Sequence, residues 1–438
     1  MNAAASAEFS AATASREPVS RHLLPDAAII GADGHLVIGG CDVLELATEF
    51  GTPLFVYDEA HLRARCREAV AAFGPGVAYA TKAFLCKAMA SLAFEEGMSL
   101  DVSTGGELAV ALAAGVEPGA LVLHGNNKSS EELRDALRGG VGRIVVDSFE
   151  EIRRLGDLAD PDGAQAVSIR VTPGVEAHTH EFVMTGQEDS KFGFSVASGA
   201  AAAALTALLE IPGLVVDGAH AHIGSQIFGL EAFAQEIAVL APFLLEHGLS
   251  ELSIGGGLGI AYLNSEQAPS ITEWAGTVLA ACRAAGVPDT VALSAEPGRA
   301  IVATAGITCY RVGTVKELPG IRTYVSVDGG MSDNPRPVLY GSGYEAFLPR
   351  ATDAARPLSC RIVGKHCESG DVLVAEAQLP ESLAIDDVLC TPVTGAYGFS
   401  MASNYNRLPR PPVVFVRDGT ARVVVRRERI EDLLRLEP

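Results

Sequence analysis

Residues 77–82 read VAYATK, a short apolar run that ends in two polar residues, and this run is the first of a series. Such runs are rich in β-branched and apolar residues and are too short for a buried helix, so they indicate buried strands. Eight of them follow one another along the chain: Val77–Lys82, Ser99–Thr104, Leu121–Asn126, Arg143–Ser148, Ala166–Val171, Gly218–Gly224, Glu251–Gly257 and Thr290–Glu296.

The stretches between these runs have a different pattern. In Ser130–Arg138 and Leu230–His247, for example, apolar residues recur three and four positions apart, which is typical of an amphipathic helix. Eight strand–helix units in about 250 residues is the size expected of a (β/α)8 barrel. We therefore predict an α/β fold with a TIM-like barrel over residues 52–297. A doubly wound open sheet shows the same alternation and is the structural alternative.

The rest of the chain predicts a second, mostly β domain. Over residues 298–438 helix signals are sparse, and residues 22–51 are expected to contribute to this domain because chain ends often lie close together. Residues 1–21 are small and polar without the pattern of a signal peptide, so we expect a disordered tail. The strand-like segments of the second domain are Ala300–Thr308, Thr323–Val327, Ser359–Val363, Val388–Pro392, Val413–Val416 and Ala421–Val425.

Composition excludes several classes of function. The 438 residues include 33 basic and 54 acidic ones, a net charge of −21, which disfavours nucleic acids and anionic membranes as partners. No apolar run approaches the ~18 residues that span a bilayer. The eight cysteines are scattered without a C-x-x-C pair, which indicates free thiols and a cytoplasmic protein. Only six residues are lysine, so lysine chemistry has few candidates.

Active sites of barrels lie at the carboxyl ends of the strands, and three motifs stand there. Lys82 ends the first run, either as a structural ion pair or as an amine that attacks a carbonyl. Gly255–Gly259 (GGGLG) follows the seventh run, either as a tight turn or as a backbone cradle for a phosphate. Glu296 and Arg299 end the eighth run, either paired together or holding a ring nitrogen and a carboxylate.

Two H-x-H pairs, at 220–222 and 178–180, raise the possibility of zinc, because alternate residues of a strand face the same side. The candidates for a completing ligand are Asp147 and Glu296, and neither gives a recognisable ligand set. We therefore predict no metal and prefer a single imidazole, His222, stacked on an aromatic cofactor. An amine, an anion cradle, a buried carboxylate and a flat side chain together match the needs of pyridoxal phosphate.

At this point the chain resembles a known family, the diaminopimelate decarboxylases. These are fold-type III pyridoxal-phosphate enzymes with an alanine-racemase-like barrel and a β domain, and the resemblance runs from about residue 25 to the end. The ordered motifs that carry it are Tyr79–Ala83 (YATKA), His222–Gln226 (HIGSQ), Gly255–Gly257 (GGG), Glu296–Arg299 (EPGR), Val327–Tyr340 (VDGGMSDNPRPVLY), Cys367–Asp371 (CESGD) and Gly395–Tyr397 (GAY).

The resemblance implies a role for each cofactor-binding residue. Lys82 would form the internal aldimine, His222 would stack on the ring, and Glu296 would keep the pyridine nitrogen protonated. The other implied cofactor-binding residues are Ser225, Gly257, Gly298, Arg299 and Tyr397.

The resemblance also implies the substrate contacts. Cys367 would be the acid that protonates the α-carbon, and Glu368 would bind the distal ammonium group. In the family these two residues reach the site from the partner subunit, which implies a homodimer with shared active sites. The residues implied to bind the distal carboxylate are Arg299, Arg336 and Tyr340, with Tyr397 also at the substrate.

The expected function is the decarboxylation of meso-2,6-diaminopimelate to L-lysine and CO2, the last step of lysine biosynthesis. One alternative is a related fold-type III decarboxylase that acts on another amino acid in a secondary pathway. Others are a catalytically silent cofactor binder and a metal-dependent hydrolase that uses the H-x-H pairs. The segment 178–191 reads as a mobile loop that could close over the site.

Overall fold

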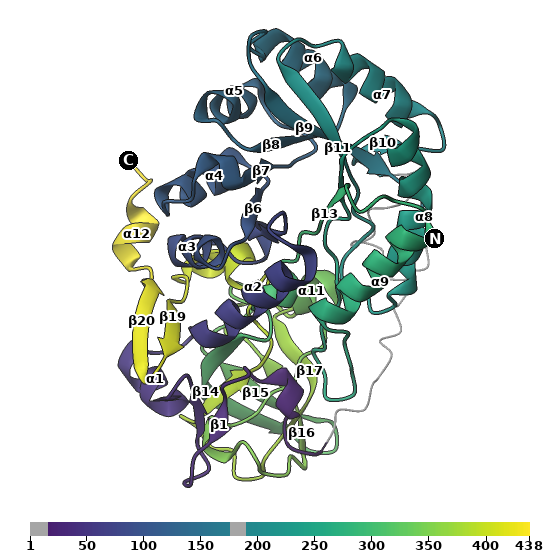
Figure 1. Cartoon of the computed structure of the whole chain (residues 1–438). Helices are drawn as coiled ribbons and strands as arrows, with labels where there is room; N and C mark the ends of the chain where they lie inside the picture. The colour runs from purple at the N-terminus through teal and green to yellow at the C-terminus, as the bar shows by residue number, and fades with distance from the viewer. Residues whose placement is uncertain (1–15, 176–189) are drawn as a thin grey trace, which may run out of the picture. The chain divides into compact units, whose positions relative to one another are not determined.

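The computed structural model describes residues 16–175 and 190–438, and the chain divides into two compact units (Figure 1). The first, here called the barrel unit, comprises residues 60–260 and 267–303. The second, here called the β unit, comprises the described residues up to 59 together with 261–266 and 304–438.

Parallel strands form the centre of the barrel unit, and each pairs with the next. Two backbone hydrogen bonds close the ring: Ala78 N donates to Ala295 O at 2.9 Å, and Ala80 N donates to Pro297 O at 3.2 Å. The sequence prediction of a barrel rather than an open sheet is therefore confirmed. The eight strands in the described part of this unit are β5 (Ala78–Ala80), β6 (Ser99–Val102), β7 (Leu121–Leu123), β8 (Arg143–Val146), β9 (Gln165–Thr172), β11 (Leu214–His220), β12 (Glu251–Ser253) and β13 (Ala292–Ser294), and the short β10 (Phe194–Ser195) pairs with β9 outside the ring.

Helices surround these strands, as Figure 1 shows. Local sequence explains where two of them begin, because Ser129 with Glu132 and Ser270 with Glu273 form capping boxes that satisfy the first free N–H groups. The helices are α2 (Glu59–Phe73), α3 (Lys87–Glu95), α4 (Gly105–Ala113), α5 (Ser130–Gly139), α6 (Phe149–Leu158), α7 (Ala200–Leu209), α8 (Glu231–Glu246), α9 (Ile271–Ala284) and α10 (Arg299–Val302).

A mixed sheet forms the core of the β unit, in the order β17-β16-β15-β14-β4-β19-β20, with β18 also paired to β14. Small helices, α11 (Arg336–Tyr340) and α12 (Ile430–Leu434), accompany it. The strands are β4 (Leu54–Asp58), β14 (Gly306–Leu318), β15 (Arg322–Val327), β16 (Leu358–Val363), β17 (Val372–Leu379), β18 (Val388–Thr391), β19 (Val413–Arg417) and β20 (Thr420–Val425).

The N-terminal segment differs from its prediction in detail. Its strands β1 (Ile29–Ile30), β2 (Leu36–Ile38) and β3 (Cys41–Asp42) form a separate small sheet, followed by α1 (Val43–Phe50). The strand that joins the large sheet is β4, which the predicted barrel range of 52–297 had included. Its five residues are all buried, and it lies between β14 and β19.

Two further predicted boundaries differ from the structure. The predicted strand Ala300–Thr308 begins as helix α10, because Gly298 and Arg299 start a helical turn before β14. The predicted tail ended at residue 21, whereas Arg16 O and Glu17 O already accept hydrogen bonds from Arg356. The described residues contain no helix with the length and apolar character needed to cross a bilayer.

Candidate active site

Lys82 lies two residues beyond the end of β5, in the short 3-10 turn Thr81–Ala83, at the carboxyl edge of the barrel. Its Nζ donates to Asp101 Oδ2 at 2.8 Å. The Lys82 side chain is 45% exposed and that of Asp101 only 2%. The amine therefore lies next to a buried carboxylate and remains accessible to a ligand.

Glu296, two residues beyond the end of β13, is the centre of a buried cluster. His220 Nε2 contacts its Oε2 at 3.0 Å, and His124 Nε2 lies 3.1 Å from its Oε1. Ser253 Oγ also donates to Oε1, at 3.1 Å. Burial alone would favour the neutral acid, but the two imidazoles outweigh it and hold the pKa of Glu296 well below its usual range. Glu296 is thus a carboxylate at neutral pH, as a partner for a protonated ring nitrogen must be.

His222 lies two residues beyond the end of β11 and is half-buried. Its Nδ1 accepts a hydrogen bond from Gly256 N at 3.1 Å, which leaves the proton of a neutral ring on Nε2. Burial, together with the positive charges of Lys82 and Arg170, moves the pKa of His222 well below its usual value. The ring is therefore neutral and held in one orientation, which suits stacking on an aromatic cofactor.

The glycine loop after β12 approaches other backbone too closely for a side chain. A Cβ on Gly256 would lie 2.3 Å from Glu296 O, and one on Gly257 would lie 2.3 Å from Gly224 O. A Cβ on Gly298 would lie 2.9 Å from Ala80 O. These positions demand glycine, and a glycine loop at a barrel edge is the kind of backbone that binds phosphate.

Ser225 and Arg299 complete this group. Arg299 Nη2 donates to Ser225 Oγ at 2.8 Å, so a hydroxyl and a buried guanidinium meet beside the glycine loop. The structure thus places the barrel residues proposed for the cofactor on one edge: Lys82, His222, Ser225, Gly257, Glu296, Gly298 and Arg299.

This edge fits pyridoxal phosphate. An amine, a buried carboxylate, a neutral flat ring and a backbone cradle are the groups that the cofactor's aldehyde, ring nitrogen, ring face and phosphate require. In addition, Asp101 Oδ1 is buried and has no hydrogen-bond partner among the described residues, as expected of a group that faces a ligand.

The remaining predicted residues belong to the β unit. Arg336, on α11, is buried: its Nη1 donates to the Tyr344 hydroxyl at 2.6 Å, and its guanidinium lies 4.3 Å from the centre of the Tyr262 ring. Tyr340, at the end of the same helix, and Tyr397, with φ 59°, are half-buried.

Cys367 and Glu368 lie in the loop between β16 and β17, and both are exposed. Cys367 N donates to Asn406 Oδ1 at 3.2 Å. The backbone of this loop is therefore anchored although its side chains face outward.

The metal hypothesis has one candidate cluster at this edge. His124, His220 and Glu296 could each offer a ligand atom, all within 4.8 Å of one another. His222 is not part of that group, and His178, His180 and most of the predicted loop at 178–191 lie outside the described residues. Asp147, the other candidate ligand, contacts Arg170 and Gly193 instead.

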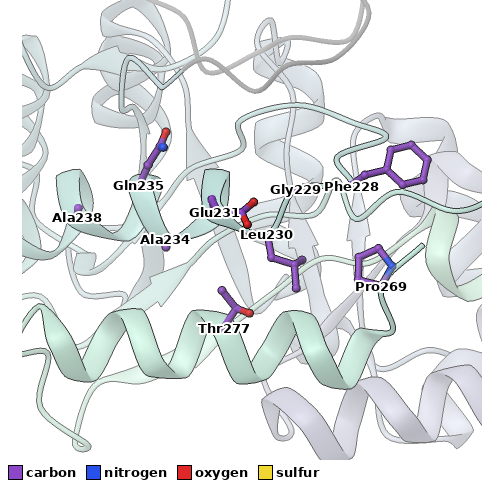
Figure 2. Close-up of a pocket in the computed structure, with 9 residues that line it drawn as sticks. All are labelled: Phe228, Gly229, Leu230, Glu231, Ala234, Gln235, Ala238, Pro269 and Thr277. Carbon is purple, nitrogen blue, oxygen red and sulfur yellow. The ribbon is translucent and has the colours of Figure 1, made fainter. Parts of the chain in front are cut away.

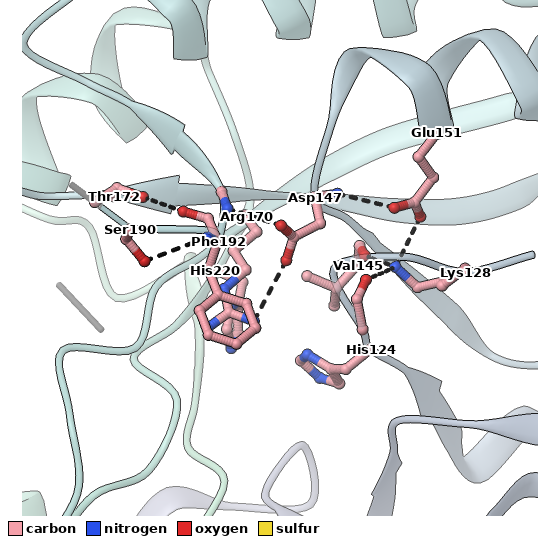
Figure 3. A network of polar contacts seen from close by, with 12 residues as sticks. His124, Lys128, Val145, Asp147, Glu151, Arg170, Thr172, Ser190, Phe192 and His220 are labelled. Atoms are coloured by element: carbon pink, nitrogen blue, oxygen red, sulfur yellow. Dashed lines mark hydrogen bonds and ion pairs between the residues drawn. The ribbon is translucent and has the colours of Figure 1, made fainter. Parts of the chain in front are cut away.

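Sequence reasoning missed a network behind the edge (Figure 3). Lys128 Nζ donates to Gly125 O, Val145 O and Glu151 Oε1, each at 2.7 Å. The other Glu151 oxygen accepts from Asp147 N at 3.2 Å, and Asp147 Oδ2 lies 3.4 Å from Arg170 Nη1. The available signal was a lysine next to a predicted strand end, which alone does not identify its partners.

A groove also lies between α8 and α9 (Figure 2). It is mostly apolar, and none of the proposed site residues lines it. The lining residues are Phe228, Gly229, Leu230, Glu231, Ala234, Gln235, Ala238, Pro269 and Thr277.

Comparison with known proteins agrees with the geometry. Residues 59–303 match the family model for the pyridoxal binding domain of pyridoxal-dependent decarboxylases. The diaminopimelate decarboxylase of Mycobacterium tuberculosis is 49% identical over 425 residues, which cover 92% of this chain and 95% of that protein. The Bacillus subtilis enzyme of the same name is 46% identical, over 92% and 95%.

Solved structures agree in fold as well. Diaminopimelate decarboxylase from M. jannaschii in complex with L-lysine has a TM-score of 0.87 and 32% identity, covering 94% of this chain and 98% of that one. The Helicobacter pylori enzyme complexed with L-lysine has a TM-score of 0.82 and 31% identity, over 90% and 98%. The predicted enzyme class and cofactor are thus confirmed: this is a pyridoxal-phosphate-dependent decarboxylase. The chain belongs to the diaminopimelate decarboxylase family.

Proposed function

We propose that this protein decarboxylates meso-2,6-diaminopimelate to L-lysine and CO2, as the last step of lysine biosynthesis. The observation that carries the proposal is the barrel edge, which carries both an accessible lysine amine, Lys82, and a buried carboxylate held in its charged form, Glu296. Sequence identity to diaminopimelate decarboxylases over most of the chain supports the choice of substrate, as does the L-lysine in two similar solved structures.

The cofactor residues then have distinct tasks. When bound, pyridoxal phosphate supplies the electron sink for the carbanion that loss of CO2 leaves. Lys82 binds its aldehyde, His222 packs on its ring, and Glu296 holds a proton on its ring nitrogen. The residues that bind the phosphate and the remaining edges of the cofactor are Ser225, Gly257, Gly298, Arg299 and Tyr397.

The substrate-binding residues select the substrate and hold it in one orientation. A second carboxylate on the substrate gives the buried guanidinium of Arg336 a charged partner, at about 1.5–3 kcal/mol for a charge-assisted hydrogen bond. Three further residues bind the substrate together with Arg336: Arg299, Tyr340 and Tyr397. Glu368 binds the distal ammonium group. A diamine with one carboxylate gives the buried Arg336 guanidinium no carboxylate partner, so lysine and ornithine are poor substrates. Cys367 gives a proton to the α-carbon after CO2 leaves.

We also propose a homodimer with shared active sites. Cys367 and Glu368 are exposed in the single chain, whereas the reaction needs them at a site shielded from water. A second copy of the chain provides that cover. A cytoplasmic location is proposed as well, since all eight cysteines lie in the described residues and are free thiols.

The decisive experiment supplies meso-diaminopimelate to the purified holoenzyme. We expect release of CO2 and L-lysine, and an absorbance band from lysine-linked cofactor. Lys82→Ala removes the amine, so both the band and the turnover are lost. Lys87→Ala, an exposed lysine at the start of α3, is the matched control and keeps both.

The outcomes separate the alternatives. No band in the unaltered protein would overturn the proposal altogether. A band without turnover of meso-diaminopimelate, but with turnover of another amino acid, would instead favour a related decarboxylase of a secondary pathway.

A further inference from the structure

The loop that carries Cys367 is held by contacts that the proposed function does not explain. Asp371, at its end, accepts from His366 N at 2.9 Å and from Met331 N at 2.7 Å. Lys365 N donates to Gly329 O at 2.9 Å. These bonds fix both flanks of the loop to the segment after β15. The backbone of Cys367 itself is held by another residue.

That residue is Asn406, from a separate segment near the end of the chain. Its Oδ1 accepts from Cys367 N at 3.2 Å and contacts His366 Nδ1 at 3.2 Å. An amide oxygen has two lone pairs, so these two bonds use it fully. The buried His366 contacts Ser332 Oγ with its Nε2, at 2.8 Å. With its proton on Nδ1, the His366 ring donates a hydrogen bond to Asn406 Oδ1 and accepts one from the Ser332 hydroxyl.

Asn406 has an unusual backbone conformation. Its φ of 51° lies in the left-handed region, which asparagine adopts more readily than other non-glycine residues. The neighbouring Tyr405 ring packs against His366 with centroids 5.2 Å apart. The turn at 405–407 thus presents one amide oxygen to the backbone of Cys367.

We propose that Asn406 is a positioning residue for Cys367. A hydrogen bond to the Cys367 N–H fixes the peptide plane before the residue, and hence the direction in which its Cβ and thiol leave the backbone. This inference rests on the proposed function, which makes Cys367 the proton donor. Asn406 itself touches neither substrate nor cofactor in this role.

The test compares substitutions at residue 406 in two backgrounds, unaltered and Cys367→Ala. Asn406→Gly removes the acceptor without strain, because glycine tolerates the positive φ, so the protein still folds. We expect it to lower kcat about tenfold, the worth of one hydrogen bond, with little change in KM or in cofactor binding. In the Cys367→Ala background the same change should lower kcat no further.

Two companion variants sharpen the result. Asn406→Asp keeps an acceptor oxygen and tolerates the same backbone, so it should retain most of the kcat. Asn404→Ala is the matched control: this asparagine directly precedes the same turn, but its Nδ2 donates to Leu408 O and Glu428 Oε2. Any effect of that control should be the same in both backgrounds.

Two outcomes contradict the inference in distinguishable ways. If Asn406→Gly leaves kcat unchanged, or lowers it equally in both backgrounds, Asn406 does not act through Cys367 and the inference alone is overturned. If Cys367→Ala keeps full activity, the proton-donor role in the proposed function fails, and the inference fails with it.

Discussion

Glu236, on α8, is a fully buried carboxyl group. Its side chain is 0% exposed, and neither carboxylate oxygen has a hydrogen-bond partner among the described residues. Burial, reinforced by the negative charge of Glu296, raises the pKa of Glu236 well above its usual value. The native protein therefore keeps this group protonated at a pH where the unfolded chain releases the proton.

This linkage has a definite sign. As pH rises above the unfolded pKa of about 4.3, the unfolded state loses its proton first, so native stability falls by up to about 1.4 kcal/mol per pH unit. The fall continues until the pH passes the raised native pKa. Glu236→Gln has no proton to lose, so we expect it to stabilise the protein more at pH 8 than at pH 5.

Urea unfolding curves at the two pH values measure the effect. The exposed Glu246→Gln, at the end of the same helix, is the control and should follow the pH dependence of the unaltered protein. If Glu236→Gln also follows that dependence, the carboxyl group is not protonated in the native state.

At the residue scale, sequence predicted the types of group at the site better than their partners. Lys82 and Glu296 stood out because charged residues are unusual at the ends of apolar strands. The sharing of Glu296 between His124 and His220 was not predictable, because hydrogen bonds between distant segments leave no local pattern. Asp101 was missed because one carboxylate within an apolar run gives no sign that it faces an amine.

At the scale of elements, all eight predicted barrel runs contain strands, but most of the strands end earlier. The run Glu251–Gly257 contains β12, which ends at Ser253 because Gly255 and Gly257 then turn the backbone with positive φ. The strand β4 was predictable as a strand and not as a member of the β unit. A strand buried on both faces has the same apolar sequence pattern in either sheet. Its pairing with the distant strands β14 and β19 determines which sheet it joins.

The ion pair between Lys128 and Glu151 connects the segment after β7 to helix α6. Both side chains are 2% exposed. Burial lowers the pKa of Lys128, which the Glu151 charge partly offsets, and burial raises the pKa of Glu151. Each group therefore depends on the other to remain charged.

We expect Lys128→Met to destabilise the protein by about 3–5 kcal/mol, because Glu151 is left buried without a cation. Adding Glu151→Met should recover much of that loss. A double-mutant cycle from denaturant unfolding measures the coupling. The matched control is the exposed pair Arg153–Glu150 on the same helix, for which little coupling is expected. Additive effects at Lys128 and Glu151 would show that their contact contributes nothing.

At the scale of the whole molecule, the two-domain organisation was predictable, but its interleaving was not. Residues 261–266 belong to the β unit although the chain on both sides belongs to the barrel unit. The reason is a tertiary contact, since Tyr262 packs on Arg336. No change of composition in the sequence marks the segment 261–266 as part of the β unit.

The proposed shared sites predict complementation between inactive variants. In a hybrid dimer of Lys82→Ala and Cys367→Ala, one site carries both changes and the other carries neither. Random mixing of equal amounts should therefore restore about a quarter of the unaltered sites, provided that subunits exchange.

The readout is lysine production after the two variants are co-expressed or unfolded and refolded together. Lys82→Ala mixed with Glu296→Ala is the control, since both changes fall in the barrel unit and every site keeps one defect. No recovery in the first mixture, with hybrids demonstrated by mass, would contradict sharing of Cys367 between subunits.

The position of β4 in the middle of the β unit's sheet has a consequence for synthesis. This strand is made early, but one of its neighbours, β19, begins only at Val413. At 5–20 residues per second, the intervening ~350 residues take roughly 20–70 s to translate. The barrel unit, in contrast, is complete by residue 303. On the ribosome we thus expect the barrel to fold while LFVYD still lacks a neighbour, so the yield of folded protein depends on shielding that one strand from other nascent chains.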